Sequence, residues 1–123
     1  MKPTTLEDCF WLLESNCDPK ELEKAQSLSE DKFVGMSHHG MGMWIRNNWG
    51  LWSGDSGISK FFRDLGIYHA DDMSGIILTS FHRHLLKKPL EIDKQVEHYL
   101  DFWKKQGVDL KADWEASQKQ STP

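Results

Sequence analysis

The chain has 123 residues, of which 38% are hydrophobic and 28% charged, and this is the composition of one globular domain rather than of a disordered or membrane-embedded chain. Its net charge of −4 argues against non-specific binding to a nucleic-acid backbone, and no apolar run approaches the roughly 18 residues that a membrane span requires. The first ten residues, MKPTTLEDCF, carry acids where a signal peptide has its apolar stretch, so we expect a cytoplasmic protein.

Helix-start signals recur along the first third of the chain, and no convincing alternating strand pattern appears. Each signal pairs a capping side chain with an acidic residue three positions later: Thr4 with Glu7, Asp18 with Glu21, and Ser27 with Glu30. We predict three helices that begin near these positions. On one helix, Cys9 and Cys17 would lie about 12 Å apart along the axis, too far for a disulfide, so we expect two free thiols.

The segment MGMWIRNNWGLW, residues 41–52, interleaves three tryptophans with arginine and asparagine. Tryptophan is costly to leave in water, whereas arginine and asparagine are costly to bury without partners. Helical spacing predicts a core-facing side with Ile45 and Trp49. It also predicts an outer stripe of four residues: His39, Met43, Arg46 and Gly50. We therefore interpret the segment as a helix that lies between the core and a binding site.

Further helices are predicted after the turn GDSG, residues 54–57. Their apolar stripes run from Ile58 to Leu65, closed by Gly66; from His69 or Ala70 to Lys87-Lys88-Pro89; and from Ile92 to Trp103, ending at Gly107. The tail beyond is polar and ends in SQKQSTP. The sequence therefore predicts an all-α, compact single-domain bundle of roughly six or seven short helices in residues 1–107. A polar and partly disordered C-terminal tail is predicted for residues 108–123.

A second polar pattern lies opposite the apolar face of the predicted helix DDMSGIILTSFHRHL. Its members are Asp72, Gly75, Thr79, His82 and Arg83. A glycine inside a helix costs about 1 kcal/mol relative to alanine, so we expect a packing or an access reason for Gly75. The pattern predicts either tight helix packing at Ser74-Gly75 or a polar wall that faces the tryptophan segment.

All three arginines and five of the six histidines lie in residues 36–86. Arginine favours planar recognition and buried pairing. We expect Arg46 either to pair with a carboxylate, Asp71 or Asp72, or to clamp a phosphate or carboxylate of a ligand through two parallel hydrogen bonds.

The runs SHHGMGMWIRNNWGLW and LGIYHADDMSGIILTSFHRHL are distinctive. They resemble the pattern H-x-G-x-G-M-W-I-R-N-N-W, then L-G-x-Y-H-x-D-D-M-S-G-I-I-L-T-S, of a family of small bacterial domains with no assigned function. The resemblance covers roughly residues 4–103 and is dense between residues 37 and 85. It implies that the two motifs lie together in space.

The residue chemistry favours a non-enzymatic binding module for a small anionic aromatic ligand, such as a nucleotide or a nucleotide-derived signal. Tryptophan faces can stack on a base, each stack contributing roughly 1–3 kcal/mol. Arginines can neutralise phosphates, and asparagines can read base edges. One context for such a module is sequestration of a signal in a conflict between phage and bacterium. The candidate ligand-binding residues are His39, Met43, Trp44, Arg46, Asn47, Asn48, Trp52, Arg63, Asp72, Thr79, His82 and Arg83.

Two alternatives stay open. The first is a protein-interaction module, an inhibitor or immunity-type partner anchored by Trp44, Trp52 and Arg46, in which the acidic first 35 residues steer a basic partner. The second is a metal-dependent hydrolase built on four residues: His38, His39, His69 and Asp72. No nucleophile elbow, P-loop or cofactor motif is identified, and no catalytic residue is assigned. The sequence leaves homo-oligomer formation open.

Overall fold

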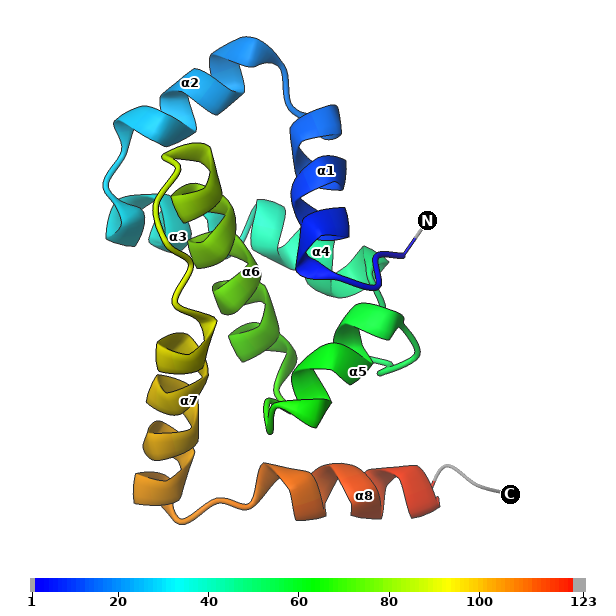
Figure 1. The fold of residues 1–123 in the computed structure, drawn as a ribbon. Helices are drawn as coiled ribbons and strands as arrows, with labels where there is room; N and C mark the ends of the chain where they lie inside the picture. Colours follow the sequence, from blue (N-terminus) through cyan, green and yellow to red (C-terminus); the bar gives the residue numbers. More distant parts are fainter. Residues whose placement is uncertain (1, 121–123) are drawn as a thin grey trace.

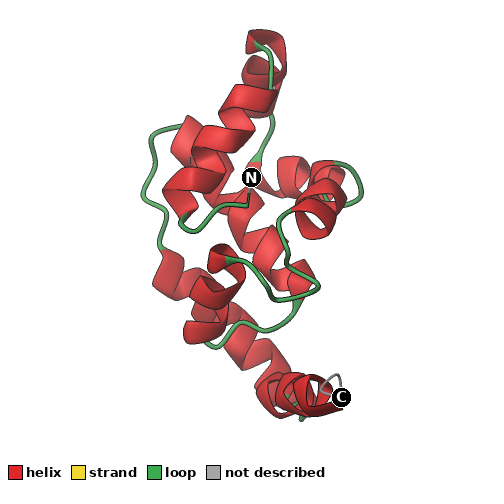
Figure 2. Ribbon diagram, turned by 90° about the vertical axis from the view of Figure 1, so that its right-hand side faces the viewer, coloured by secondary structure: helices red, strands yellow, loops and turns green. Residues whose placement is uncertain are grey.

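The computed structural model describes residues 2–120 and contains, within this range, eight α-helices and no strand (Figure 1). In chain order the helices are α1 (Leu6–Asn16), α2 (Pro19–Ser27), α3 (Glu30–Ser37), α4 (Met41–Asn48), α5 (Gly57–Asp64), α6 (Ala70–Leu85), α7 (Ile92–Gln106) and α8 (Leu110–Gln120). Figure 2 shows the same helices joined by short loops. The all-α fold predicted from the sequence is confirmed, with one helix more than the upper end of the predicted number.

Helix α6 runs through the middle of the fold and contacts α1, α2, α3, α4 and α7 (Figure 1). Nine of its 16 residues are buried, more than the single apolar stripe of a surface helix provides. The buried set includes three polar residues, Ser74, Ser80 and His82. Every buried side-chain nitrogen or oxygen in the described part of the chain has a hydrogen-bond partner, so these polar groups are compatible with the centre of the fold.

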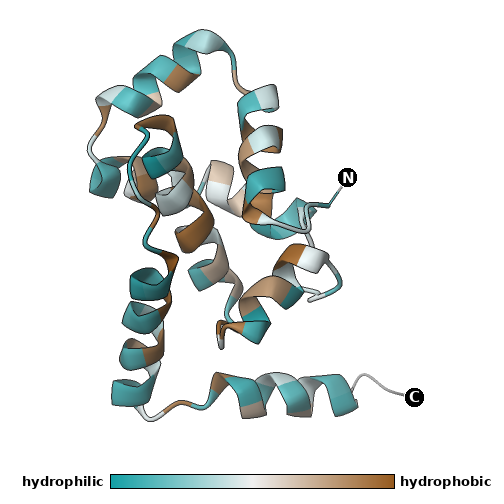
Figure 3. Ribbon diagram, viewed as in Figure 1, coloured by the Kyte–Doolittle hydropathy of each residue, from teal (hydrophilic) through white to brown (hydrophobic). Residues whose placement is uncertain are grey.

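Large side chains fill the space between α6 and the helices around it. Trp49, Phe62 and Phe81 are each at most 2% exposed. Burial of one such side chain stabilises the fold by roughly 1.5–3 kcal/mol. Figure 3 shows hydrophobic residues along α6, whereas α8 is mostly hydrophilic. The tryptophan segment therefore contributes Trp49 to the core, as its spacing predicted, together with the fully buried Ile45.

Side-chain caps fix the beginnings of the first three helices. The capping residues are Thr5 with Asp8 for α1, Asp18 with Glu21 for α2, and Ser29 for α3. The second cap is the predicted one, the first lies one residue later than predicted, and the third lies two residues later. The Asp8 carboxylate accepts hydrogen bonds from the backbone N–H and the hydroxyl of Thr4, and these bonds lower the pKa of Asp8. The extra donors favour this register.

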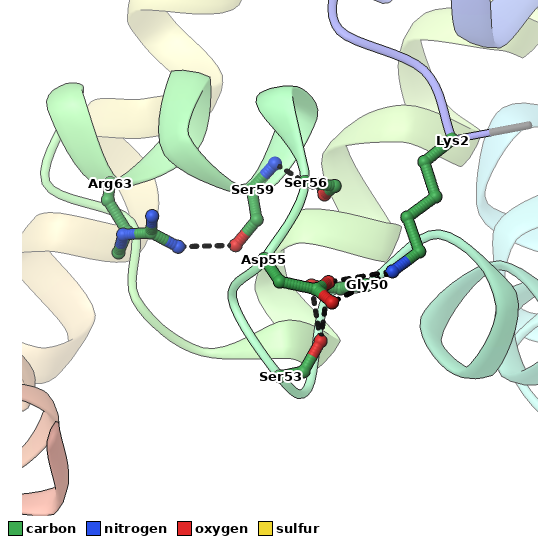
Figure 4. Close-up of polar contacts among 7 residues, drawn as sticks. All are labelled: Lys2, Gly50, Ser53, Asp55, Ser56, Ser59 and Arg63. Carbon is green, nitrogen blue, oxygen red and sulfur yellow. Dashed lines mark hydrogen bonds and ion pairs between the residues drawn. The ribbon is translucent and has the colours of Figure 1, made fainter. Parts of the chain in front are cut away.

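The prediction of a helix that reaches Trp52 was wrong, because α4 ends at Asn48. Gly50 follows with a φ of +69°, a left-handed conformation that glycine adopts without strain. A Cβ at Gly50 would collide with the Asp55 carboxylate, which accepts hydrogen bonds from Lys2 at 2.9 Å and from Ser53 at 2.7 Å (Figure 4). The backbone therefore turns at Gly50.

The C-terminal part of the chain is more ordered in structure than its polarity predicted. Helix α7 ends before Gly107, as predicted, but residues 110–120 then form α8 where a polar tail was expected. The Trp114 ring lies 5.9 Å from the Tyr68 ring and beneath the Arg63 guanidinium, 4.6 Å away, and these contacts attach α8 to the rest of the fold. The part of the predicted disorder that falls on residues 121–123 lies outside the described residues.

Two further predictions concern a membrane span and the state of the two cysteines. Within residues 2–120, the helices are too short or too polar to span a bilayer. Cys9 and Cys17 are free, as predicted. Burial raises the pKa of the Cys9 thiol far above its usual range, so this thiol is a packing group rather than a nucleophile.

Candidate functional site

Arg46, the centre of the predicted ligand site, lies in the interior of the protein and is only 4% exposed. Its Nη1 donates to the Ser74 hydroxyl at 2.8 Å, and its Nη2 donates to the His38 carbonyl at 2.9 Å. Its Nε lies 3.3 Å from a carboxylate oxygen of Asp71. The Ser74 hydroxyl in turn donates to the Asp71 carbonyl at 3.0 Å. The guanidinium thus joins α4 to α6, and its carboxylate partner is Asp71 rather than Asp72.

The predicted outer stripe of the tryptophan segment is not a continuous surface. Met43 is 44% exposed, but Arg46 on the same short helix is buried. His39 precedes α4 and Gly50 follows it, so neither continues a helical stripe. One signal that sequence reasoning missed is Gly42, four residues before Arg46. A Cβ there would lie 3.1 Å from Nη1 of Arg46, so the glycine leaves room for the guanidinium to fold back into the protein.

Arg83 is also held by groups of the protein itself. Its Nε and Nη2 donate to the two carboxylate oxygens of Glu30 at 2.6 and 3.2 Å, and its Nη1 donates to the Leu90 carbonyl at 2.6 Å. Hydrogen bonding to Arg83 lowers the pKa of Glu30. The neighbouring His82 is 2% exposed, and its Nε2 lies 2.9 Å from the Leu28 carbonyl. Both residues therefore fasten α6 to the segments beside it.

Three members of the predicted polar pattern of α6, Asp72, Gly75 and Thr79, lie against α7 and not against the tryptophan segment. The Asp72 carboxylate accepts a hydrogen bond from the Trp103 indole at 2.7 Å. A Cβ at Gly75 would lie 2.7 Å from the Tyr99 hydroxyl, so Gly75 allows α6 and α7 to pack closely. Tight helix packing was one of the two predictions made for this glycine. Thr79 lines a small cavity of about 250 Å³ with Tyr99. Desolvation raises the pKa of Asp72, although the hydrogen bond from Trp103 opposes the shift. The predicted wall facing α4 was wrong for Asp72, Gly75 and Thr79.

The exposed tryptophans of the first motif lie beside hydrogen-bonded asparagines of the same segment. Trp44 is 46% exposed and Trp52 is 59% exposed. The Trp52 indole donates to the Asn47 side chain at 3.1 Å, and the Asn48 side chain donates to the Trp44 carbonyl at 2.8 Å. The Trp52 ring also meets the His69 ring edge-on at 6.3 Å. These four predicted residues are exposed at the surface, whereas Arg46 is buried.

The residues of the metal hypothesis are not brought together as a ligand set. His38 and His39 meet edge to face, with ring centroids 4.8 Å apart. Within residues 2–120, no group of three or more His, Cys, Asp or Glu side chains is placed to hold a metal ion. His69 instead caps α6, accepting a hydrogen bond from the Asp71 backbone at 3.0 Å.

A large groove that the sequence did not predict lies between α1, α2 and the end of α6; we call it the α1–α2 groove. Its volume is about 1010 Å³. It is lined by Glu7, Phe10, Trp11, Glu14, Cys17, Pro19, Leu22, Glu23, Gln26, His84, Leu85, Lys87, Lys88 and Leu90. Trp11 is 63% exposed. The signal that could have indicated it is that Trp11 falls outside the α1 stripe of Leu6, Cys9, Phe10 and Leu13.

Aromatic rings line the α1–α2 groove, and the lining residues from α1 and α2 include Glu7, Glu14 and Glu23. Phe10 stacks on His84 with ring centroids 4.6 Å apart, and the His84 Nε2 lies 3.3 Å from the Glu14 carboxylate. The first 35 residues carry four lysines and eight acids, a net charge of −4. Lys87 and Lys88 also line it, just after α6 ends. The groove lining thus combines three glutamates from α1 and α2 with two lysines that follow α6.

These features define a small all-α domain built around one buried helix, with its two sequence motifs joined in the interior by the Arg46 hydrogen bonds. A family model, Domain of unknown function (DUF6794), matches residues 2–85, about two thirds of the chain. The chain belongs to this family, which confirms the predicted membership of an uncharacterised domain family. No match was found among curated proteins or among solved structures. The matched region ends at Leu85, the last residue of α6, so α7 and α8 lie beyond it.

Proposed function

We propose that this protein is a protein-interaction module that binds a basic amphipathic helix of a partner in the α1–α2 groove. The observation that carries the proposal is the 63% exposed Trp11 beside a groove of about 1010 Å³. An exposed tryptophan next to an apolar concavity is the residue type and the setting that dominate binding energy at protein interfaces.

The apolar lining of the groove suits the apolar face of a helix. Phe10, Leu22 and Leu85 come from three different helices and line it together with Trp11. Amphipathic helices bind in this way, with apolar side chains at i, i+3, i+4 and i+7 entering a hydrophobic groove. A helix of three to four turns, roughly 12–15 residues, is about 20 Å long and presents one such apolar face.

Charge selects a basic helix over an acidic one. Glu7, Glu14 and Glu23 line the α1 and α2 side of the groove, and the surrounding first 35 residues have a net charge of −4. Complementary potential accelerates association and disfavours partners of the same sign. We expect lysines and arginines on the flanks of the bound helix, and an acidic residue near the end that meets Lys87 and Lys88.

The interaction hypothesis is preferred to an anionic ligand at the predicted residues for a chemical reason. A phosphate at Arg46 or Arg83 would have to displace Asp71 or Glu30, the carboxylates that these guanidiniums already contact. In the interaction hypothesis the anchors also change, from Trp44, Trp52 and Arg46 to Trp11. Trp44 and Trp52 are exposed but do not line the α1–α2 groove.

A peptide selection tests the proposal with the full chain as the target. The library displays helical peptides of about 15 residues with fixed apolar positions at i, i+3, i+4 and i+7 and variable charged or neutral residues elsewhere. We expect the selected peptides to be rich in lysine and arginine and to bind more weakly as the salt concentration rises. Recovery of acidic peptides, or of none above background, would contradict the proposal.

A further inference from the structure

We propose that a second site, at the opposite end of the protein from the α1–α2 groove, binds a small aromatic anion such as an aryl phosphate or a nucleoside monophosphate. The site is a cavity of about 450 Å³ bounded by the end of α5, the end of α7 and the beginning of α8. Figure 1 shows α8 running below α5 and α7, on the far side of the fold from α1 and α2. We call this cavity the α5–α8 pocket.

The α5–α8 pocket is lined by Arg63, which has no carboxylate partner among the described residues. Arg63 donates from Nη1 to the Ser59 hydroxyl at 2.6 Å (Figure 4). Its guanidinium also lies over the Trp114 ring, 4.6 Å from the ring centroid. Among the described residues, no carboxylate oxygen lies within 4.0 Å of it, in contrast to Arg46 with Asp71 and Arg83 with Glu30. Since Ser59 and Trp114 are uncharged, the Arg63 guanidinium is fixed in position and retains its charge for an anion.

Aromatic rings border the same space. Tyr68 and Trp103 line the pocket, and the Trp114 ring that supports Arg63 lies 5.9 Å from the Tyr68 ring. Stacking of a planar ligand on such rings contributes roughly 1–3 kcal/mol. A guanidinium beside aromatic faces selects a ligand that has both an anionic group and a ring.

The remaining charges in the pocket favour an anion. Lys104 and Lys111 line it together with Arg63, whereas the acids that line it are Asp64 and Asp109. Asp64 is paired with Lys60 at 3.0 Å, and Asp109 accepts a hydrogen bond from the Ala112 backbone at 3.0 Å. Both carboxylates are thus engaged, and positive charge is in excess.

The size and the position of the pocket narrow the ligand class. A volume of about 450 Å³ lies in the range of small-molecule sites and suits a ligand of one ring system and one phosphate rather than a polymer. Residues 63–68 lie within the region matched by the family model, and residues 100–111 lie beyond it. The pocket is therefore formed where this chain's C-terminal helices meet the family domain.

The test is calorimetry on the full chain with four probes: adenosine monophosphate, phenyl phosphate, adenosine and inorganic phosphate. We expect both aromatic phosphates to bind and the other two to bind at least about tenfold more weakly. Arg63→Gln should weaken the two phosphates by at least about tenfold, whereas Lys94→Gln, which removes a positive charge from α7 outside the pocket, should have no effect. Absence of binding, or inorganic phosphate binding as tightly as phenyl phosphate, would overturn the proposal.

A second variant keeps the proposal testable if Arg63→Gln fails to fold. Lys104 and Lys111 are exposed, so their joint replacement by glutamine leaves the fold intact and should weaken phenyl phosphate binding severalfold. Unchanged affinity in that double variant would contradict the proposal. In the indole region of the proton–nitrogen spectrum, phenyl phosphate should shift the Trp103 and Trp114 signals but not that of Trp11. Shifts confined to Trp11 would place the ligand in the α1–α2 groove and overturn this assignment.

Discussion

Replacing Arg46 by methionine is expected to lower the free energy of unfolding by about 3 kcal/mol, since the guanidinium makes hydrogen bonds that no other side chain can replace. Methionine is unbranched, flexible and close to arginine in volume, so the substitution removes the hydrogen bonds and the charge while leaving a smaller cavity than alanine would. The change therefore separates the polar role of Arg46 from its volume.

The magnitude follows from the three contacts of the guanidinium. The hydrogen bonds to the Ser74 hydroxyl and the His38 carbonyl come from a charged donor, and such bonds contribute about 1.5–3 kcal/mol each. The Asp71 side chain is 43% exposed, so the ion pair adds at most about 1 kcal/mol. Burial of the methionine side chain offsets part of the loss, which leaves a net cost of about 3 kcal/mol.

The matched control is Asp71→Asn, which removes the ion pair but keeps both hydrogen bonds to neutral acceptors. Its expected cost is below about 1 kcal/mol. Urea unfolding followed by far-ultraviolet circular dichroism gives both values, provided that the slope with urea concentration stays unchanged. Equal losses in the two variants, or a methionine variant as stable as the wild type, would refute the assignment of Arg46 as an internal connector. A gain in stability would instead indicate a residue kept for ligand binding.

The contacts between α6 and α7 give further predictions. Asp72→Asn keeps an oxygen acceptor for the Trp103 indole and removes a desolvated charge, so at neutral pH it should leave the free energy of unfolding unchanged or raise it by up to about 1 kcal/mol. Asp72→Ala removes the acceptor and should cost about 1–2 kcal/mol. Urea unfolding measures both values. Because burial raises the pKa of Asp72, the folded protein holds a proton that the unfolded chain has released between the ordinary and the raised pKa. Stability should fall as pH rises through that window in the wild type, and a pH series on Asp72→Asn should lack this decrease. Gly75→Ala should destabilise the fold by about 1–2 kcal/mol, because the added Cβ would lie 2.7 Å from the Tyr99 hydroxyl. In a Tyr99→Phe background the same substitution should stabilise the fold by about 0.5–1 kcal/mol. A stability change of the same sign in both backgrounds would exclude the hydroxyl as the cause.

Residues next to the helix ends were sufficient to predict both ends of α6 and the end of α7. Helix α6 begins after His69 and ends before Lys87-Lys88-Pro89, and α7 ends before Gly107, because acids, glycine and proline act within one turn of a helix end. The end of α4 was missed because the tryptophan spacing continues to Trp52, although Gly50, which follows the C-cap Trp49 with a φ of +69°, is a local helix-end signal.

The candidate site was harder to predict because burial of a polar residue is decided by distant partners. Periodicity placed Arg46 on the solvent side of its helix, yet Ser74 and Asp71 of α6 provide the acceptors that make its burial favourable. Helix α8 was missed for the same reason. Its helical pattern is weak, and Trp114 is held by contacts with Tyr68 and Arg63 rather than by a local apolar stripe.

The affinity of one selected basic peptide for three forms of the chain tests the proposed function most directly. Trp11 and Trp52 are both exposed tryptophans, at 63% and 59%, but only Trp11 lines the α1–α2 groove. Titration calorimetry should show binding weakened by at least about thirtyfold in Trp11→Ser, the loss expected of an interface anchor worth about 2 kcal/mol. Trp52→Ser should stay within about twofold of the wild type. Equal affinities in the wild type and in Trp11→Ser, or equal losses in the two variants, would contradict the account.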